Sequence, residues 1–367
     1  MFFSRGIYHQ LGVISELKPI TWLEAFLVGI EKDNGVDRMY QANTKRYEQM
    51  QYNRVGKSGL KLPALSLGLW HNFGDTDYFQ NQKEIILGAF DLGITHFDLA
   101  NNYGPPAGSA ESNFGRMLRE ELGAYRDELI ISSKAGYYMW EGPYGEWGSK
   151  KSIIASCDQS LKRVGVEYFD IFYHHRPDYE TPLEETARAL DLLVQQGKAL
   201  YIGVSNYDAQ RTLEISQLFK QLGTPFIIHQ PNYNMFDRWI EEELVEVLEA
   251  EGVGAIVYSP LAQGLLTNKY LHGIPEHSRA SRSDSPFLNE EKVEKTLASV
   301  SKLNELAAAR GQTLAEMALA WNLRLKSVAS VIVGASSLKQ LEDNVKCLEN
   351  VAFTDQELQA IDQLLKE

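Results

Sequence analysis

The sequence predicts an α/β protein whose single domain is a (β/α)8 TIM barrel, preceded by a β-hairpin and followed by extra C-terminal helices. Two observations lead to this fold class. From Ala64 onward, apolar runs of strand length alternate with amphipathic segments of helix length. Eight such runs occur, and the stretch that contains them has the length of one (β/α)8 barrel, typically about 250 residues.

Each of the eight predicted strands is a short apolar run bounded by polar or turn-forming residues. A turn around Gly59, between residues 51–55 and 61–65, predicts the hairpin that precedes them. The apolar runs of the predicted barrel strands cover residues 65–69, 94–97, 129–131, 169–173, 199–204, 226–228, 255–258 and 328–333.

The segments between these strands carry helix start and stop signals. Residues 181–184 (TPLE) have the pattern of a capping box with proline at the first helical position, and Gly197 is placed to end that helix. Residues 313–316 and 337–340 repeat the capping-box signature. No linker rich in proline, glycine or serine interrupts the repeat, so residues 39–367 are predicted to form one domain.

A doubly wound sheet is the rival fold for alternating strands and helices. If such a sheet bound a dinucleotide, the motif G-x-G-x-x-G would be expected after an early strand. Residues 252–254 (GVG) lack the third glycine, and the sequence contains no complete motif. The barrel is therefore the better prediction.

Residues 1–38 share no pattern with the barrel repeat. Their apolar patch at residues 22–30 contains Glu24, has no basic start immediately before it and shows no small-residue cleavage pattern, so it does not predict a signal peptide. We expect this segment to be an extension outside the domain. It is either poorly ordered or the result of a start assignment upstream of Met39.

Composition excludes several classes of function. The net charge of -13 argues against a nucleic-acid surface, which requires clustered basic residues. The only cysteines, Cys157 and Cys347, are too few for a disulfide framework and lack metal-ligand spacing, and Cys157 falls on the apolar face of a predicted helix. No run reaches the ~18 consecutive apolar residues of a transmembrane helix. We expect a cytoplasmic protein without a metal, a nucleic acid or a membrane partner.

Polar side chains stand at the ends of three consecutive predicted strands. Asp98 ends the second strand, and Tyr103 lies five residues further on. The third strand ends in Ser132, Ser133 and Lys134, and the fourth ends in Tyr173, His174, His175 and Arg176. The carboxyl ends of barrel strands meet on one face, so we expect these side chains to lie together. Each has a structural alternative when taken alone, such as a helix cap, a rim salt bridge or a packed ring. Their occurrence at consecutive strand ends favours a site.

The chemistry of this set is coherent. A free phenol has a pKa near ~10, and a neighbouring ammonium such as Lys134 is expected to lower that value. Asp98 would hold the ammonium in position, and the imidazole would orient a substrate carbonyl. Such a site could polarise a carbonyl and protonate its oxygen. It contains no nucleophile and no metal cage, so the electrons must come from a cofactor.

The quartet Asp98, Tyr103, Lys134 and a strand-four histidine resembles the catalytic tetrad of the aldo-keto reductases, which are (β/α)8 barrels that use NADPH. In that family the histidine falls five residues after the aspartate of a D-x-x-x-x-H run, which here assigns His175, counted from Asp170. The resemblance covers roughly residues 51–350. The motifs that carry it are GITHFDLANNYG, IISSKAG, FDIFYHHRPD, YIGVSN, YSPLAQGLL and VIVGASS.

The resemblance also implies which residues surround NADPH. Beside Asp98, it places Gly68 and Trp70 at the cofactor and substrate mouth and Tyr258 against the nicotinamide ring. It assigns the nicotinamide amide to Ser205, Asn206 and Gln230. The pyrophosphate would follow Ser259, Pro260, Leu261, Gln263 and Lys269, and the adenosine end would lie near Arg279, Ser336, Gln340, Asp343 and Asn344.

Arg279 is the expected reader of the 2′-phosphate that distinguishes NADPH from NADH. Its planar guanidinium can bind a phosphate through two hydrogen bonds, whereas the resemblance places Lys269 nearer the pyrophosphate. A solvated loop would also carry such charges, so this alternative stays open.

Within the family, the motifs are most similar to those of bacterial L-glyceraldehyde 3-phosphate reductases and potassium-channel β-subunits. The implied activity is NADPH-dependent reduction of small aldehydes, such as L-glyceraldehyde 3-phosphate or methylglyoxal-like carbonyls, with Tyr103 as general acid. Trp70, Tyr103, His175 and Arg176 would face the substrate. Two roles are open for Arg176: contact with a substrate phosphate, or a rim salt bridge to Asp178.

The alternative function is a regulatory subunit of a membrane channel that binds NADPH mainly as a ligand. We expect channel subunits to carry asparagine in place of His175, so the histidine favours turnover. The family includes monomers and oligomers, and a homo-oligomer is compatible with either function.

Overall fold

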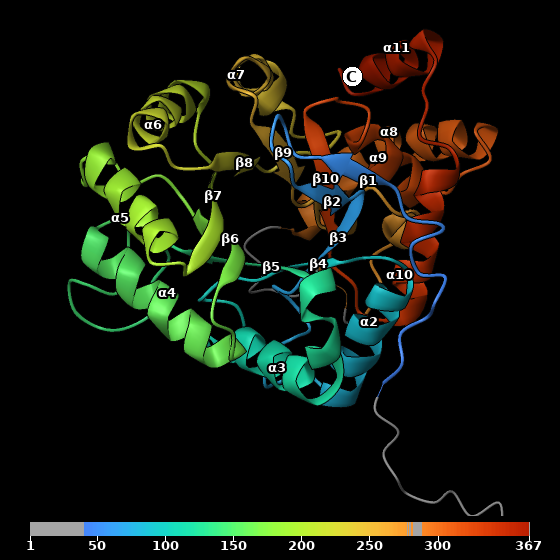
Figure 1. Cartoon of the computed structure of the whole chain (residues 1–367). Helices are drawn as coiled ribbons and strands as arrows, with labels where there is room; N and C mark the ends of the chain where they lie inside the picture. Colours follow the sequence, from blue (N-terminus) through green and yellow to red (C-terminus); the bar gives the residue numbers. More distant parts are fainter. Residues whose placement is uncertain (1–39, 277, 279, 282–287, 367) are drawn as a thin grey trace, which may run out of the picture. The chain divides into compact units, whose positions relative to one another are not determined.

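The computed structural model of the chain describes residues 40–276, 278, 280–281 and 288–366. Within them, eight parallel strands form a closed barrel surrounded by helices (Figure 1), which confirms the predicted (β/α)8 fold. Around the barrel the order is β10, β3, β4, β5, β6, β7, β8 and β9. The bounds are β3 (Leu65–Gly68), β4 (His96–Asp98), β5 (Ile130–Ala135), β6 (Phe169–His174), β7 (Ala199–Ser205), β8 (Phe226–Gln230), β9 (Gly254–Val257) and β10 (Val328–Val333).

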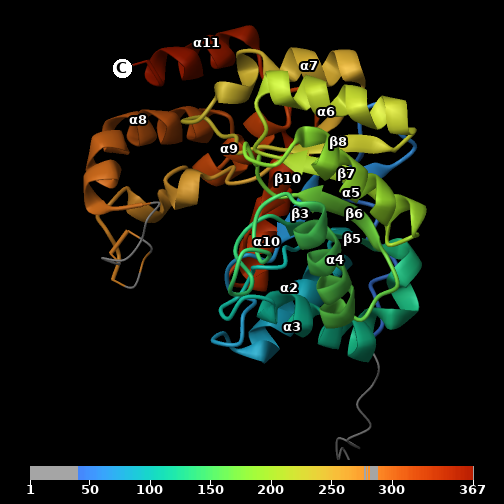
Figure 2. The same cartoon turned by 90° about the vertical axis from the view of Figure 1, so that its left-hand side faces the viewer.

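A helix follows each strand and covers the outside of the barrel (Figure 2). Two helices lie between β9 and β10. A further helix, α11, follows the last barrel helix, α10. These helices agree with the prediction of extra helices near the C-terminus. The helices are α2 (Phe79–Asp91), α3 (Ser109–Met117), α4 (Lys150–Val164), α5 (Leu183–Gln195), α6 (Ala209–Leu222), α7 (Leu244–Glu251), α8 (Glu290–Ala309), α9 (Leu314–Asn322), α10 (Leu338–Val345) and α11 (Asp355–Leu364), with short helical turns at Leu118–Leu122, Gly123–Glu128, Trp239–Glu241, Ala262–Gly264, Asn268–Tyr270 and Lys346–Glu349.

The predicted hairpin closes the amino-terminal end of the barrel. Strand β1 (Tyr52–Arg54) pairs antiparallel with β2 (Lys61–Pro63), and Lys57 N donates to Gly252 O just before β9 (2.8 Å). Gly56 has a left-handed backbone (φ 53°), and a Cβ there would lie 2.1 Å from Gly252 O, so no larger residue fits. The hairpin side chains Val55 and Leu62 are fully buried in an apolar cluster inside the barrel.

The start of α5 differs from the prediction. The helix begins at Leu183 with Pro182 as its N-cap and no side chain capping it, so the capping box predicted at residues 181–184 is wrong. Thr181 N instead donates to Asp178 Oδ1 (3.2 Å), which ties this residue to the preceding loop. At the other end, Gly197 has a left-handed backbone (φ 69°) just after the helix, which confirms it as the predicted stop.

Of the two later capping boxes that the sequence predicts, the structure shows one complete and one incomplete. Thr313 and Glu316 form the complete capping box at the start of α9. Ser337 accepts a hydrogen bond from Gln340 N at the start of α10, but the Gln340 carboxamide oxygen accepts from Ser336 N (3.0 Å) and not from Ser337. That second box is therefore only half formed.

Within the described part of the chain, no helix is both long and apolar enough to cross a membrane. The same residues contain no group of three or more His, Cys, Asp or Glu side chains that could hold a metal ion. The predictions for residues 1–38 lie outside the described residues and stay predictions.

Candidate active site

Asp98 is placed by the alternation of side chains along β4. Phe97 points outward and packs on Phe114 of α3, with ring centroids 5.2 Å apart. His96 and Asp98 therefore point into the barrel, where both are buried. Asp98 is the last residue of the strand, so the predicted end of this strand is confirmed to within one residue.

Lys134 lies in β5, one residue before its end at Ala135. The predicted strand also ends in Ser132, Ser133 and Lys134, although its apolar run stops at Ile131. Ser133 points outward, where its hydroxyl donates to Glu111 Oε1 (2.5 Å), while Ser132 and Lys134 point into the barrel. Apolar runs underestimate a strand here because its inward positions are polar.

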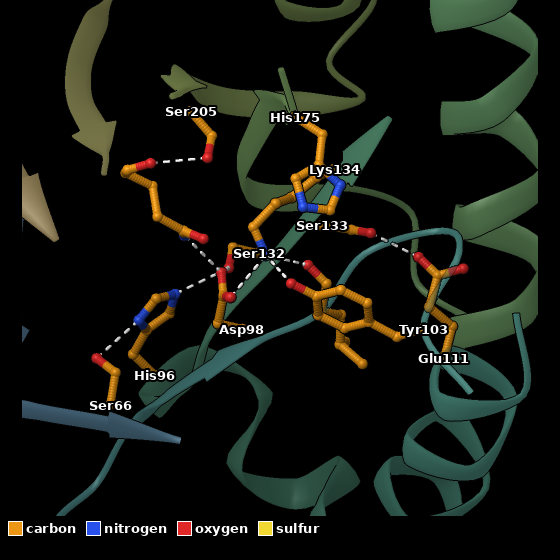
Figure 3. Close-up of polar contacts among 12 residues, drawn as sticks. Ser66, His96, Asp98, Tyr103, Glu111, Ser132, Ser133, Lys134, His175 and Ser205 are labelled. Carbon is orange, nitrogen blue, oxygen red and sulfur yellow. Dashed lines mark hydrogen bonds and ion pairs between the residues drawn. The ribbon is translucent and has the colours of Figure 1, made fainter. Parts of the chain in front are cut away.

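The Lys134 ammonium is the centre of the candidate site (Figure 3). Its Nζ lies 2.6 Å from Asp98 Oδ2, 2.7 Å from Leu99 O and 3.2 Å from the Tyr103 hydroxyl, so each of its three hydrogens has an acceptor. The side chains of Lys134 and Asp98 are almost completely buried. Burial lowers the pKa of Lys134 from its usual value, and the charge of Asp98 opposes that shift.

Two further donors fix the other carboxylate oxygen of Asp98. Ser132 Oγ donates to Asp98 Oδ1 (2.8 Å), and Gln230 Nε2 donates to the same oxygen (3.1 Å). With Lys134 on Oδ2, the carboxylate is held on both sides, and its plane is set. Sequence reasoning assigned Gln230 to the cofactor alone and gave Ser132 no role.

Tyr103 carries its hydroxyl into this network, but the predicted direction of its pKa shift is wrong. Burial raises the pKa of Tyr103 well above its usual value, and the negative charge of Asp98 acts in the same direction. Lys134 is close, but its charge is paired with Asp98. The phenol is therefore fully protonated at neutral pH, as a proton donor must be.

His175 joins the site from the loop after β6. Its ring lies edge-on to Tyr103 at 5.9 Å and to Tyr137 at 4.6 Å between centroids. Burial lowers the pKa of His175 well below its usual range, and the Lys134 charge adds to this, so the imidazole is neutral. His174 points away and binds the Tyr207 hydroxyl through Nδ1 (2.7 Å), which supports the choice of His175.

Four buried neutral histidines make stability depend on pH. Burial lowers the pKa of His96, His174 and His229 to about 4, and that of His175 also falls. In the unfolded chain each titrates near ~6.5, so below this pH the unfolded state binds protons that the folded state does not. The free energy of unfolding should therefore fall between pH ~6.5 and ~4, by up to about 1.4 kcal/mol per pH unit per histidine.

Urea unfolding in small pH steps across this window measures the effect. A free energy of unfolding that stayed constant from neutral pH down to about 4.5 would show that these histidines are not held neutral.

The residues predicted to bind nicotinamide lie together at the ends of β7, β8 and β9. The Tyr258 hydroxyl donates to Asn206 Oδ1 (2.8 Å), and Asn206 Nδ2 donates to Ser205 Oγ (3.1 Å). Ser205 Oγ in turn donates to Gln230 O (2.7 Å). Because Gln230 also binds Asp98, this hydrogen-bonded group of residues adjoins the Lys134 network.

The predicted pyrophosphate segment follows β9. Ser259 and Gln263 have left-handed backbones (φ 55° and 62°), and Gln263 Nε2 donates to Ser259 Oγ (3.2 Å). Asn206, at the end of β7, shares this conformation (φ 61°). Strained non-glycine backbone of this kind is concentrated at ligand-binding sites. Pro260 and Leu261 lie between these residues, and Lys269 lies in the exposed turn that follows.

The residues predicted for the adenosine end cluster only in part. Ser336 N binds the Gln340 carboxamide, and Asn344 is buried with its Nδ2 lacking a hydrogen-bond partner among the described residues. Asp343 instead lies on an exposed face, where Lys339 and Lys346 donate to it (2.5 and 2.6 Å). The remaining member of this predicted group, Arg279, lies outside the described residues.

Two residues predicted for the cofactor and substrate mouth lie on the side of β3. Gly68 pairs with Asp98 across the β3 and β4 strands, and a Cβ there would come within 2.6 Å of the Ile332 side chain. The Trp70 ring lies 6.3 Å from the Tyr103 ring between centroids. Both therefore lie beside the quartet, and their contact with cofactor and substrate stays a prediction.

Arg176 is a loop contact, but not the one predicted. It forms an ion pair with Glu146, and its Nε donates to Gly136 O (3.1 Å), so the proposed salt bridge to Asp178 is wrong. Its guanidinium lies 4.2 Å from the Tyr137 ring centroid and 3.7 Å from that of Trp147. Asp178 accepts hydrogen bonds from backbone N–H groups, including Gly148 N (2.9 Å). The aromatic-rich sequence of residues 137–147 could have indicated these contacts of Arg176, but the prediction did not use it.

The geometry supports proton donation to a polarised oxygen. A protonated phenol lies against an ammonium that can stabilise the phenolate it would leave, and a neutral imidazole stands beside it. These three groups converge from β4, β5 and β6, whose carboxyl ends face the same side of the barrel.

Comparison with known proteins shows the family to which this chain belongs. The chain is 57% identical over 329 residues to the L-glyceraldehyde 3-phosphate reductase of Escherichia coli O157:H7, covering 89% of this chain and 95% of that protein. It is 56% identical to that of strain K12 over the same length. It is also 38% identical over 322 residues to a probable voltage-gated potassium channel subunit beta of Arabidopsis thaliana, covering 86% of this chain and 97% of that protein.

A family model described as the aldo/keto reductase family matches residues 64–366, which include every strand of the barrel. The chain therefore belongs to the aldo/keto reductase family, whose members are oxidoreductases that use a nicotinamide cofactor.

Proposed function

We propose that this protein is a cytoplasmic, NADPH-dependent reductase of small aldehydes, with L-glyceraldehyde 3-phosphate as the preferred substrate. The observation that carries the proposal is the hydrogen-bonded group of Asp98, Lys134 and Tyr103, with His175 beside it. Similarity to the Escherichia coli reductases over nearly the whole chain supports the choice of substrate.

In the proposed reaction, the aldehyde oxygen accepts hydrogen bonds from the Tyr103 hydroxyl and the neutral His175 ring. When bound, the cofactor supplies the hydride. As the carbonyl carbon gains that hydride, Tyr103 transfers its proton to the oxygen, and the product is an alcohol. The Lys134 ammonium, 3.2 Å away, stabilises the phenolate that remains, and Asp98 keeps the ammonium in place.

The residues of this chain fit a nicotinamide dinucleotide. Asn344 has a buried amide nitrogen without a hydrogen-bond partner among the described residues, as a group awaiting a ligand would. The left-handed backbones of Asn206, Ser259 and Gln263 provide the second observation. In our proposal Ser205, Asn206 and Gln230 hold the nicotinamide amide, Tyr258 stacks on its ring, and residues 259–263 with Lys269 follow the pyrophosphate.

Cofactor choice gives a direct test of the proposed role of Arg279. Arg279→Ala should weaken NADPH binding by about tenfold to a hundredfold, the equivalent of one charge-assisted hydrogen bond, and leave NADH binding nearly unchanged. Titration of each variant with both nucleotides, followed by intrinsic fluorescence, measures this. The matched control is Lys269→Ala, which should weaken both nucleotides alike because both carry the pyrophosphate. If Arg279→Ala also weakened both alike, Arg279 would not read the 2′-phosphate.

The substrate phosphate is proposed to bind Arg176 by exchanging with Glu146. Arg176→Ala should then raise the KM for L-glyceraldehyde 3-phosphate by about tenfold or more, while kinetics with unphosphorylated glyceraldehyde change little. Steady-state assays with both aldehydes check this. Glu146→Gln is the control, because it frees the guanidinium and should not raise the KM for the phosphorylated aldehyde. Equal losses with both aldehydes in Arg176→Ala would mean that Arg176 only supports the loop at residues 137–147.

The second candidate function, an NADPH-binding subunit of a membrane channel, is favoured by the 38% identity to the Arabidopsis thaliana protein. A panel of phosphorylated and unphosphorylated aldehydes distinguishes the two functions. Oxidation of NADPH with at least one small aldehyde supports the reductase. Tight NADPH binding without oxidation by any of them would favour the channel subunit.

A further inference from the structure

A chain of polar side chains runs inside the barrel from Ser330 of β10 to Asp98. Figure 3 shows its part from Ser66 to Asp98. Ser330 Oγ lies 2.6 Å from Ser66 Oγ, which lies 2.9 Å from His96 Nδ1. His96 Nε2 lies 2.9 Å from Ser132 Oγ, and Ser132 Oγ donates to Asp98 Oδ1 at 2.8 Å. Ser330, Ser66, His96 and Ser132 are completely inaccessible to solvent, so every bond of the chain lies in a dry interior.

Counting hydrogens fixes the direction of each bond. The Asp98 carboxylate only accepts, so the single hydroxyl hydrogen of Ser132 points to it. Ser132 Oγ must then accept from His96 Nε2–H, which leaves His96 Nδ1 to accept from Ser66. Ser66 in turn accepts from Ser330. With neutral His96 in the Nε2–H form, only this arrangement satisfies all the bonds.

The surroundings of Ser330, at the far end of this hydrogen-bonded chain of side chains, indicate the role of the chain. Ser330 lies within β10, where the β1–β2 hairpin covers the barrel and Asn53 of β1 donates to Ala329 O (3.0 Å). A route for protons would have to continue to solvent, but this end is enclosed. The chain is therefore a fixed support for Asp98. Fully satisfied buried networks of this kind hold their members in one arrangement.

We propose that His96 is a positioning residue for catalysis: by donating to Ser132 it directs the Ser132 hydroxyl to Asp98 Oδ1, which turns Oδ2 toward Lys134 and aims the ammonium at Tyr103. The proposal rests on the aldehyde reduction proposed above. Among the described residues, the side-chain hydrogen bonds of Ser330, Ser66, His96 and Ser132 reach no predicted substrate or cofactor residue other than Asp98, so their effect on turnover is transmitted through Asp98.

Four variants test the proposal. His96→Leu removes the donor, and Ser132→Ala removes the hydroxyl that reaches Asp98. His96→Gln keeps a donor and an acceptor near the positions of the ring nitrogens. Ser133→Ala is the matched control. Ser133 lies on the same strand as Ser132, and its buried hydroxyl also binds a carboxylate, that of Glu111, but on the outer face of the barrel. The measurements are kcat per NADPH-binding site and the Kd for NADPH.

His96→Leu and Ser132→Ala should each lower kcat at least tenfold with the Kd for NADPH changed less than about threefold. His96→Gln should recover part of kcat, and Ser133→Ala should leave it unchanged. The proposal is overturned if His96→Leu has the kcat of the control, or if kcat and NADPH affinity fall together, as they would from damage to the barrel.

Nitrogen NMR of the wild-type imidazoles gives a readout that needs neither turnover nor a stable variant. The His96 ring should carry its proton on Nε2 with Nδ1 unprotonated. A proton on Nδ1 would reverse the chain and overturn the positioning role. If the wild type showed the Nε2–H form but reduced no aldehyde, that result would contradict only the proposed function.

Discussion

Replacing Tyr103 with phenylalanine should lower kcat about 10²- to 10⁴-fold, the usual contribution of a general acid. The hydroxyl accepts a hydrogen bond from Lys134 and is kept protonated by burial and by Asp98. In the proposed reaction it is needed only when the carbonyl oxygen takes a proton. NADPH affinity should therefore barely change, because the loss falls on the transition state and not on cofactor binding.

Tyr207→Phe is the matched control for this variant. Tyr207 is also a buried phenol with one side-chain hydrogen bond, to His174 Nδ1, but it lies away from the quartet. It should lose stability and keep its kcat. Steady-state kinetics and NADPH titration of both variants decide the matter. Near-normal kcat in Tyr103→Phe would mean that another group donates the proton.

Lys134→Met should abolish most turnover and also lower the free energy of unfolding by about 3 to 5 kcal/mol. The ion pair with Asp98 is fully buried, and removal of one partner leaves the other charge unpaired in the barrel interior. Two acceptors besides Asp98, Leu99 O and the Tyr103 hydroxyl, lose their donor as well. Urea unfolding measures the change in stability, and steady-state assays measure turnover.

The double variant Asp98→Asn with Lys134→Met separates stability from catalysis. Because it removes both charges, it should recover much of the stability lost in Lys134→Met, while turnover stays absent. If Lys134→Met unfolded at the wild-type urea concentration, the buried ion pair would not contribute to folding as the geometry implies.

Most of the barrel could be predicted from the sequence because its strands are short apolar runs between amphipathic helices. In β5 the apolar run stops at Ile131 although the strand continues to Ala135, because the inward-pointing residues Ser132 and Lys134 are polar. Hydrophobic patterning fails where the interior of the barrel serves a polar site. Side-chain caps were also predicted unevenly, since no side chain caps α5 and Thr181 N instead binds Asp178 in the preceding loop.

The site could be predicted as a set of strand ends but not as a network. Asp98, Lys134 and a histidine after the fourth strand follow from their positions along the strands, whereas the choice of His175 over His174 rests on the family resemblance. The partnership of Ser132 with Asp98 depends on the register between β4 and β5, which pairs these two residues and which no local pattern contains. The sign of the Tyr103 pKa shift depends on burial, and the partner of Arg176 depends on the path of a loop.

Transfer of label from deuterated cofactor tests the central claim most directly. The protein is incubated with L-glyceraldehyde 3-phosphate and NADPH that carries deuterium at both C4 positions of the nicotinamide, and the product is examined by mass spectrometry and NMR. We predict glycerol 3-phosphate with one deuterium on the carbon that was the aldehyde, formed in proportion to the NADPH consumed. Tight binding of NADPH with no deuterium in any alcohol product would contradict the claim that this chain is an aldehyde reductase.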